Sequence, residues 1–249
     1  MNVLLADYSL WLLMAIGIAA VLYSSVGHGG ASGYLAAMAL FGLEPALMKP
    51  AALTMNIFVT LLVLYRTSLV RQFDWRLFSP IIVASVPMAF LGGAYTIQSS
   101  AYKIVVGLLL MLAVLRMFWQ TDDVAVARKR PEILVALPVG GVLGFVSGLT
   151  GVGGGIFLSP LLLLLRWTDI KGSVPIAAAF ILLNSVAGLS GYVASGGTWP
   201  PGMPVLVGVA LTGALMGSEL AASRLATEGL RRMLGVVLVV AGFKMILTA

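Results

Sequence analysis

Long apolar runs separated by short polar segments dominate this sequence. Ten such stretches can be marked, at about 8–26, 29–42, 50–65, 77–97, 102–119, 133–150, 153–165, 174–195, 202–223 and 232–248. Eight of them are long enough to cross a bilayer core, which takes about 20 apolar residues in a helix. The second and the seventh are shorter and follow glycine clusters, so we expect tilted spans or re-entrant half-helices there. The pattern predicts an all-α polytopic membrane protein.

Composition supports this class and excludes others. Of the 249 residues, 60% are hydrophobic and 10% are charged, where soluble domains carry about 25% charged residues. A water-soluble globule and a disordered chain are therefore both excluded. The chain has no cysteine and a single histidine, which excludes disulfides, thiolate nucleophiles and histidine-cluster metal sites. We expect no cofactor, no metal and no enzymatic activity.

The basic residues divide unequally when loops are assigned alternately to the two sides of the membrane. One side carries three of the 15, namely Lys49, Lys103 and Lys244. The other side carries Arg66, Arg71, Arg76, Arg116, Arg128, Lys129, Arg130, Arg166, Lys171, Arg224, Arg231 and Arg232. The positive-inside rule places this second side in the cytoplasm and both termini outside. The net charge of +6 thus indicates orientation in the cytoplasmic membrane rather than a nucleic-acid partner. Because Met1–Ser9 has no basic segment, no signal peptide is expected.

The two halves of the chain resemble each other at an offset of 124 to 128 residues. The matched pairs are Gly27/Gly151, Gly29/Gly153, Gly30/Gly154, Asn56/Asn184, Trp75/Trp199, Gly93/Gly217, Lys103/Arg231, Gly107/Gly235, Arg116/Lys244 and Met117/Met245. We therefore predict a first repeat at 1–120, a cytoplasmic linker at 121–132 and a second repeat at 133–249. Five segments per half is an odd number, so the repeats would be inverted, with segments 1–2 and 6–7 forming hairpins. Inverted repeats are typical of secondary transporters, whose substrate site lies between them near the midplane.

Two glycine-rich stretches interrupt the helical pattern, SSVGHGGASG at 24–33 and SGLTGVGGG at 147–155. Clustered glycines break helices, and a helix that starts after a break has unpaired N–H groups and partial positive charge at its N-terminus. Two such N-termini would form an anion site without a buried cation. The candidate residues are Gly27, Gly29, Gly30, Gly151, Gly153 and Gly154. The alternative is helix packing, which we expect for the regularly spaced Gly140, Gly144 and Gly148.

Several polar side chains fall within the apolar stretches. Asn56 and Asn184 are either interhelical clamps or donors to a bound oxyanion. Hydroxyl candidates near the breaks and in the spans are Ser24, Ser25, Ser147, Thr150, Ser185 and Thr54. These hydroxyls either bind substrate oxygens or hydrogen-bond their own helices.

Ionisable residues are few in the predicted spans. His28 lies inside the first break, where it would serve a proton-coupled step or anion binding, or simply form a structural hydrogen bond. Lys49 and Lys171 precede the third and eighth apolar stretches, where they would either attract anions at the mouths of the bundle or, as isolated interface lysines, serve as anchors. Glu219 is the deepest acid, near the cytoplasmic end, and is expected to be snorkelled or paired.

The segment GLTGVGGGIFLSPLLLLL at 148–165 resembles the signature of the sulfite exporter TauE/SafE family, and SSVGHGGASGYL at 24–35 together with Asn184 extends the similarity to both halves. The first-half motif departs from the second, with His28, Ala31 and Ala36 where the second has Val152, Gly155 and Pro160. The resemblance implies a secondary transporter for small sulfur-containing anions such as sulfite or organosulfonates, often in the export direction.

The central hypothesis is an oxyanion bound at the midplane by the paired breaks and by Asn56 and Asn184, with the repeats rocking to expose it to each side. The lipid bilayer and a small anion would be the partners, and the oligomeric state is left open. A passive anion channel with the same site is the first alternative. A remote alternative is an intramembrane serine protease that uses Ser147 and His28.

Overall fold

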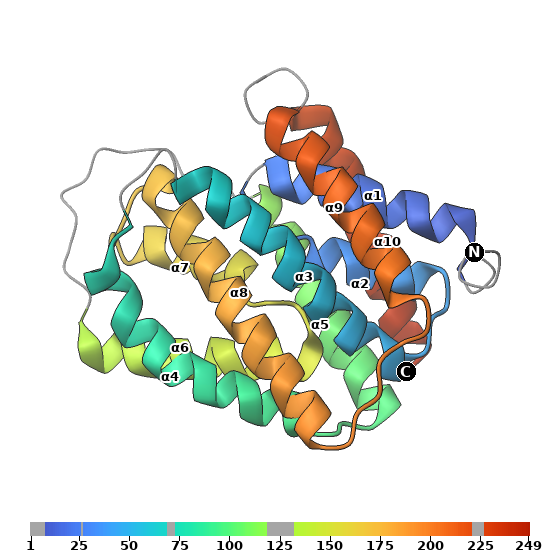
Figure 1. Ribbon diagram of the computed structural model, residues 1–249, viewed down its shortest axis with the longest axis horizontal. Helices are drawn as coiled ribbons and strands as arrows, with labels where there is room; N and C mark the ends of the chain where they lie inside the picture. Colours follow the sequence, from blue (N-terminus) through green and yellow to red (C-terminus); the bar gives the residue numbers. More distant parts are fainter. Residues whose placement is uncertain (1–7, 26, 69–72, 119–131, 221–226) are drawn as a thin grey trace.

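A computed structural model describes residues 8–25, 27–68, 73–118, 132–220 and 227–249, which form ten helices (Figure 1). Their bounds are α1 Leu10–Ser25, α2 Ala31–Leu40, α3 Pro45–Ser68, α4 Trp75–Ala94, α5 Ser99–Phe118, α6 Ile133–Thr150, α7 Gly155–Leu164, α8 Ile170–Ala194, α9 Met203–Leu220 and α10 Thr227–Leu247. Each predicted apolar stretch corresponds to one of these helices. The all-helical class is confirmed.

The predicted number of long spans is confirmed only in part. Four helices are long and apolar enough to cross a membrane by length and composition: α3, α4, α6 and α8. In the described part of the chain the other six helices have apolar segments of 10–17 residues, not the eight long and two short segments expected. At 10 residues each, α2 and α7 span only about 15 Å. Both are therefore half-helices by length.

Local sequence signals explain where several helices begin and end. The Asp74 carboxylate accepts hydrogen bonds from two backbone N–H groups of the first turn of α4, both at 3.1 Å. Asp169 caps α8 in the same way through Gly172 N, at 2.8 Å. At the end of α6, Gly151 adopts a left-handed conformation with φ of 84°, which favours glycine over any residue with a side chain.

Glycines bring α4 and α6 together backbone to backbone. Gly140, Gly144 and Gly148 lie one turn apart on α6, and a Cβ atom on each would come within 2.2 Å of a carbonyl oxygen of α4. A similar contact joins α9 to α1, where Gly213 and Gly217 of α9 meet the backbone of α1. Small residues permit this close approach between membrane helices. The predicted packing role of the α6 glycines is confirmed.

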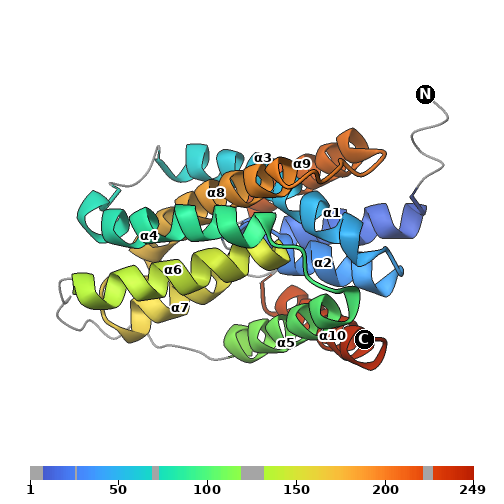
Figure 2. The ribbon, with the colours of Figure 1, turned by 90° about the horizontal axis from the view of Figure 1, so that it is seen from below.

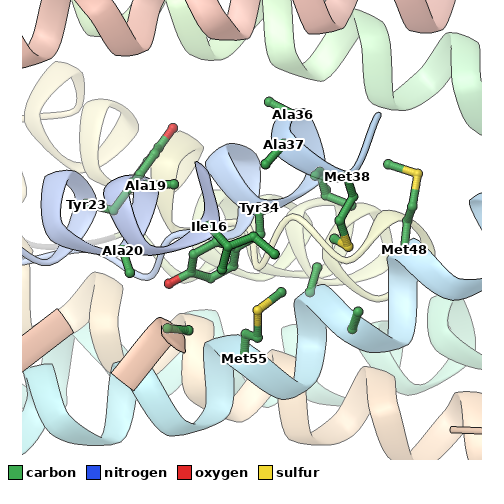
Figure 3. Close-up of a cluster of buried hydrophobic side chains, with 14 of the residues drawn as sticks. Ile16, Ala19, Ala20, Tyr23, Tyr34, Ala36, Ala37, Met38, Met48 and Met55 are labelled. Atoms are coloured by element: carbon green, nitrogen blue, oxygen red, sulfur yellow. The ribbon is translucent and has the colours of Figure 1, made fainter. Parts of the chain in front are cut away.

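The long helices α3 and α8 pack against each other in the middle of the molecule, with α4 and α6 beside α8 and with α9 beside α3. A separate pair, α5 and α10, lies along one edge and reaches α2 through α10 (Figure 2). The half-helix α2 is enclosed by α1, α3 and α10. Its Tyr34 and Met38 are fully buried, together with Met48 and Met55 of α3 (Figure 3). The half-helix α2 therefore lies inside the bundle, whereas α7 packs on α8 and is buried along one face only.

Hydrogen bonds join helix ends that the charge distribution assigns to one side. The Tyr8 hydroxyl donates to Pro201 O at 2.6 Å, so the start of the first segment meets the loop that contains Trp199. The Lys103 ammonium donates to Thr248 O at 2.7 Å, so the loop before α5 meets the end of α10. These contacts agree with the predicted grouping of the loops.

An ion pair joins two helix ends assigned to the opposite side. Arg66 of α3 lies 3.6 Å from Glu219 of α9, nitrogen to oxygen. Glu219 is therefore paired, as expected. Residues 121–131 of the predicted linker, and five of the predicted cytoplasmic basic residues, lie outside the described residues.

The close contact of α4 with α6 should make the stability of the protein sensitive to a larger residue at Gly148. Replacing Gly148 by Ala would place a methyl group 1.9 Å from Ala89 O, and the helices would have to separate. Such overpacking costs about 1–3 kcal/mol, so we expect a lower midpoint of thermal unfolding in detergent.

The matched control is Gly141→Ala on the same helix, where the nearest atom to a new Cβ is Met88 Cγ at 3.7 Å. This variant should be as stable as the parent or slightly more so, because alanine favours the helix. Equal midpoints for Gly148→Ala and Gly141→Ala would contradict the packing described.

Candidate functional site

The two glycine breaks lie at the starts of the half-helices α2 and α7. Gly27, Gly151, Gly153 and Gly154 all have positive φ, between 70° and 84°, so the backbone there turns in a way that other residues rarely tolerate. Gly30 and Gly154 occupy the N-cap positions of α2 and α7, and neither helix has a side-chain cap. The first N–H groups of both half-helices therefore lack the side-chain partner that usually satisfies them.

The breaks meet at one residue of α3, Asn56. A Cβ atom on Gly29 of the first break would lie 3.0 Å from Asn56 Oδ1. A Cβ atom on Gly153 of the second break would lie 2.8 Å from Asn56 Nδ2. The Asn56 amide thus lies between two breaks that are 124 residues apart in the chain. Only glycine leaves room for this amide at both positions.

The amide of Asn56 is fully buried, and neither its oxygen nor its nitrogen has a hydrogen-bond partner among the described residues. Such a group costs about 1–3 kcal/mol when it is left unsatisfied. Buried side-chain amides in folded proteins are nearly always paired. An unpaired donor at the junction of two uncapped helix starts is therefore suited to bind a ligand with hydrogen-bond acceptors.

The α8 side of the junction is mainly apolar. Ile181 Cγ2 lies within 3.3 Å of the Cβ position of Gly29 and within 2.9 Å of that of Gly153. Ser185 follows one turn later on the same helix face. Its hydroxyl is fully buried and has no hydrogen-bond partner in the described part of the chain. Asn56 and Ser185 are thus two unpaired polar groups on the two central helices.

The second asparagine has a different role. Asn184 Oδ1 accepts a hydrogen bond from the Ser85 hydroxyl of α4 at 2.6 Å, and its Nδ2 donates to Phe180 O at 2.9 Å. Both ends of this amide are occupied, so Asn184 clamps α8 to α4. Asn184 is thus an interhelical clamp, whereas the Asn56 amide forms no such hydrogen bond among the described residues.

Four of the predicted hydroxyl candidates bond their own helices. Ser24 donates to Ala20 O at 2.6 Å, Ser25 to Leu22 O at 2.8 Å, Thr54 to Pro50 O at 2.7 Å and Thr150 to Val146 O at 2.7 Å. Their protons are used within α1, α3 and α6, which is the common alternative for Ser and Thr in helices. The structure therefore gives these four hydroxyls local hydrogen bonds.

His28 connects the first break to the second half-helix. Its Nε2 lies 2.9 Å from the hydroxyl oxygen of Ser159 on α7, at hydrogen-bonding distance. Ser147 is fully buried, and its hydroxyl has no partner among the described residues. His28 and Ser147 therefore do not form the hydrogen-bonded dyad that a serine protease would need.

Some features of the site were not expected from the sequence. Thr60 Cγ2 and Ile181 Cγ2 lie 2.8 Å and 3.3 Å from the Cβ position of Gly29, beside Asn56 Oδ1 at 3.0 Å. An isoleucine and a threonine in apolar helices have no distinguishing signal. Lys49 is buried, with 7% of its surface exposed, and is not the interface anchor that its position before the third apolar stretch suggested. The described residues contain no group of three His, Cys, Asp or Glu side chains suited to a metal ion.

Comparison with known proteins identifies the family. Residues 12–245 match the family described as Sulfite exporter TauE/SafE. The chain is similar to the probable membrane transporter protein y4hK of Sinorhizobium fredii, with 35% identity over 239 residues that cover 94% of this chain and 97% of the relative.

A second relative is a probable membrane transporter protein of Methanocaldococcus jannaschii, 28% identical over 196 residues that cover 73% of this chain and 72% of the relative. No solved structure matches the chain. The match over nearly the whole length, together with helices long and apolar enough to span a bilayer, means that this chain is a membrane transporter of the TauE/SafE family, and not an enzyme.

Proposed function

We propose that this protein is a secondary transporter of small sulfur-containing anions, sulfite or short organosulfonates such as sulfoacetate, and that it binds them where the two glycine breaks meet. The observation that carries the proposal is the Asn56 amide, fully buried and without a partner among the described residues, between Gly29 and Gly153. Sulfite and sulfonate groups offer several acceptor oxygens and negative charge. Both properties match this site.

Four groups would contact the anion, two helix starts and two side chains. The uncapped starts of α2 and α7 supply backbone N–H groups and the positive ends of two helix dipoles. Asn56 Nδ2 and the Ser185 hydroxyl supply side-chain donors. None of the Asp and Glu residues whose burial is described is buried, so no carboxylate would repel the anion from within the bundle.

The inverted-repeat organisation is part of the proposal. Under a correspondence of α1–α5 with α6–α10, the packing of α4 on α6 corresponds to that of α9 on α1, and the packing of α4 on α8 corresponds to that of α9 on α3. Asn56 and Ile181 contact the same two glycines and are 125 residues apart. Ile181 is therefore a better counterpart of Asn56 than Asn184 is.

In this proposal, the repeats move relative to each other and expose the anion to either side in turn, with both termini outside the cytoplasm. A passive channel with the same site is the alternative. Counterflow in proteoliposomes separates the two mechanisms. Sulfite trapped inside the vesicles should accelerate entry of labelled sulfite if the site alternates. An entry rate that does not respond to internal sulfite would favour a channel and contradict alternating access.

If the Asn56 amide binds the anion, removing it should weaken binding. Asn56→Ala removes a donor that would bond a charged ligand, an interaction of about 1.5–3 kcal/mol, so affinity for the anion should fall by about 10- to 100-fold. The stability of the ligand-free protein should be unchanged or higher, because the lost amide has no partner there.

Asn184→Ala is the comparison. It should lower the unfolding midpoint, because Ser85 loses its acceptor, yet it should leave the affinity within a few-fold of the parent. Affinity is measured by the ligand-induced shift of the thermal unfolding midpoint. The assignment fails if Asn184→Ala weakens binding while Asn56→Ala does not.

If the anion binds beside the second glycine break, a side chain at Gly153 should abolish transport. At Gly153, with φ of 79°, the Cβ of an alanine would lie 2.8 Å from Asn56 Nδ2 and 2.9 Å from Ile181 Cγ2. Gly153→Ala should therefore displace the amide and abolish transport.

Gly42→Ala is a matched control, because Gly42 has φ of 75° and nothing within 4 Å of its Cβ position. The control suffers a similar backbone strain, about 1–2 kcal/mol, without the collision. Normal transport by Gly153→Ala, or equal loss in both variants, would count against the site.

A further inference from the structure

Lys49 lies near the start of α3 and is buried in the bundle, with 7% of its surface exposed. Its ammonium group donates to three carbonyl oxygens at the C-terminal end of α4: Gly93 O at 2.7 Å, Tyr95 O at 3.2 Å and Gly92 O at 3.5 Å. It also lies 5.5 Å from the centre of the Tyr192 ring. Lys49 therefore links α3 to the ends of both α4 and α8.

The charge of Lys49 has no formal counter-charge. Among the residues whose burial is described, it is the one buried charged side chain. The ion pair found among the described residues joins Arg66 to Glu219 instead. The carbonyls of α4 and the ring face offer partial negative charge, which satisfies the donors but leaves a net positive charge inside the bundle. Such charges are costly in an apolar interior and commonly mark functional positions.

Lys49 also adjoins the proposed anion site. A Cβ atom on Gly151 of the second break would lie 3.0 Å from the Lys49 carbonyl oxygen and 3.3 Å from its Cα. Lys49 precedes Asn56 by seven residues on α3, which places the two α-carbons about 10 Å apart along the helix. The ammonium points toward α4, so it does not contact an anion bound at Asn56.

We propose that Lys49 is a specificity-determining residue that selects ligands by their charge, through its electric field rather than by contact. The inference rests on the proposed anion site. The seven-residue spacing on α3 puts the Lys49 ammonium and an anion at Asn56 on the order of 10–15 Å apart. At that range and with an effective dielectric constant of about 20, a unit positive charge improves the binding of an anion on the order of tenfold per unit of ligand charge. Because Lys49 is buried, salt screens this effect less than it screens a surface charge. A merely structural cap of α4 would not depend on the charge of the ligand.

The test compares two ligands of similar size and different charge. Isethionate carries one negative charge, and sulfoacetate carries a carboxylate in place of the hydroxymethyl group and therefore two. Purified full-length Lys49→Met should bind isethionate about tenfold more weakly than the parent does and sulfoacetate about a hundredfold more weakly. Lys49→Arg, which keeps the charge, should retain the preference for the dianion.

The matched control is Lys103→Met, since Lys103 also donates to the carbonyl of a helix end, Thr248 O, but does so at the surface. This variant should bind both ligands with nearly parental affinity. Lys49→Gln keeps a donor for the α4 carbonyls while removing the charge, and it replaces Lys49→Met if that variant does not fold.

Two outcomes overturn different claims. Equal fold-losses for the monoanion and the dianion in the charge-removing variant would make Lys49 a structural cap and refute its role in selectivity. If the parent protein binds neither anion, or if Asn56→Ala binds both as well as the parent, the proposed function itself fails, whatever Lys49 does.

Discussion

Two helices of this protein begin inside the bundle rather than at its surface, and the site depends on how their first N–H groups are satisfied. In a lipid-embedded bundle no bulk water can pair with these groups, so irregular backbone is tolerated only where protein or a polar cavity surrounds it. Neither α2 nor α7 has a side-chain cap. Both start beside Asn56, whose amide is also without a partner in the described part of the chain. The unpaired Asn56 amide and the two helix starts without side-chain caps are thus concentrated at one point of the fold.

The rest of the packing keeps these two starts in place. Glycines allow α6 to touch α4, and α9 to touch α1, through direct backbone contacts. The Asn184–Ser85 hydrogen bond also joins α8 to α4. Interiors packed this closely do not deform continuously but favour discrete arrangements. Such a frame suits a transporter, because it can hold an anion site between two rigid parts.

Much of the fold was predictable from the sequence, because a polytopic membrane protein shows its helices as apolar runs. The predicted stretches 133–150 and 153–165, separated by the glycine cluster, correspond closely to the helices Ile133–Thr150 and Gly155–Leu164. The lengths were less predictable: where an apolar run begins does not say where helical hydrogen bonding begins. For example, α3 starts at Pro45, five residues before the expected stretch, and so brings Lys49 into the bundle.

The residue types of the site were predictable from the sequence, but which of them have hydrogen-bond partners was not. The clustered glycines and Asn56 stand out by residue type, yet Asn184 stands out equally. The difference between them lies in a partner 99 residues away, Ser85, which has no distinguishing signal of its own. Ile181 could not be found at all, because an isoleucine in a buried helix is the commonest of observations. Long-range contacts decide which polar residues are free to bind, and local patterns do not contain them.

The proposed anion site is tested most directly by locating a bound anion in the protein. Crystals grown with selenite, the heavier analogue of sulfite, allow the selenium atom to be located by anomalous diffraction. We expect a selenium site within hydrogen-bonding distance of Asn56 Nδ2, between Gly29 and Gly153, with the N-termini of α2 and α7 directed toward it. A selenium site elsewhere in the bundle, with the Asn56 amide still unpaired, would show that the anion does not bind at the junction of the two glycine breaks.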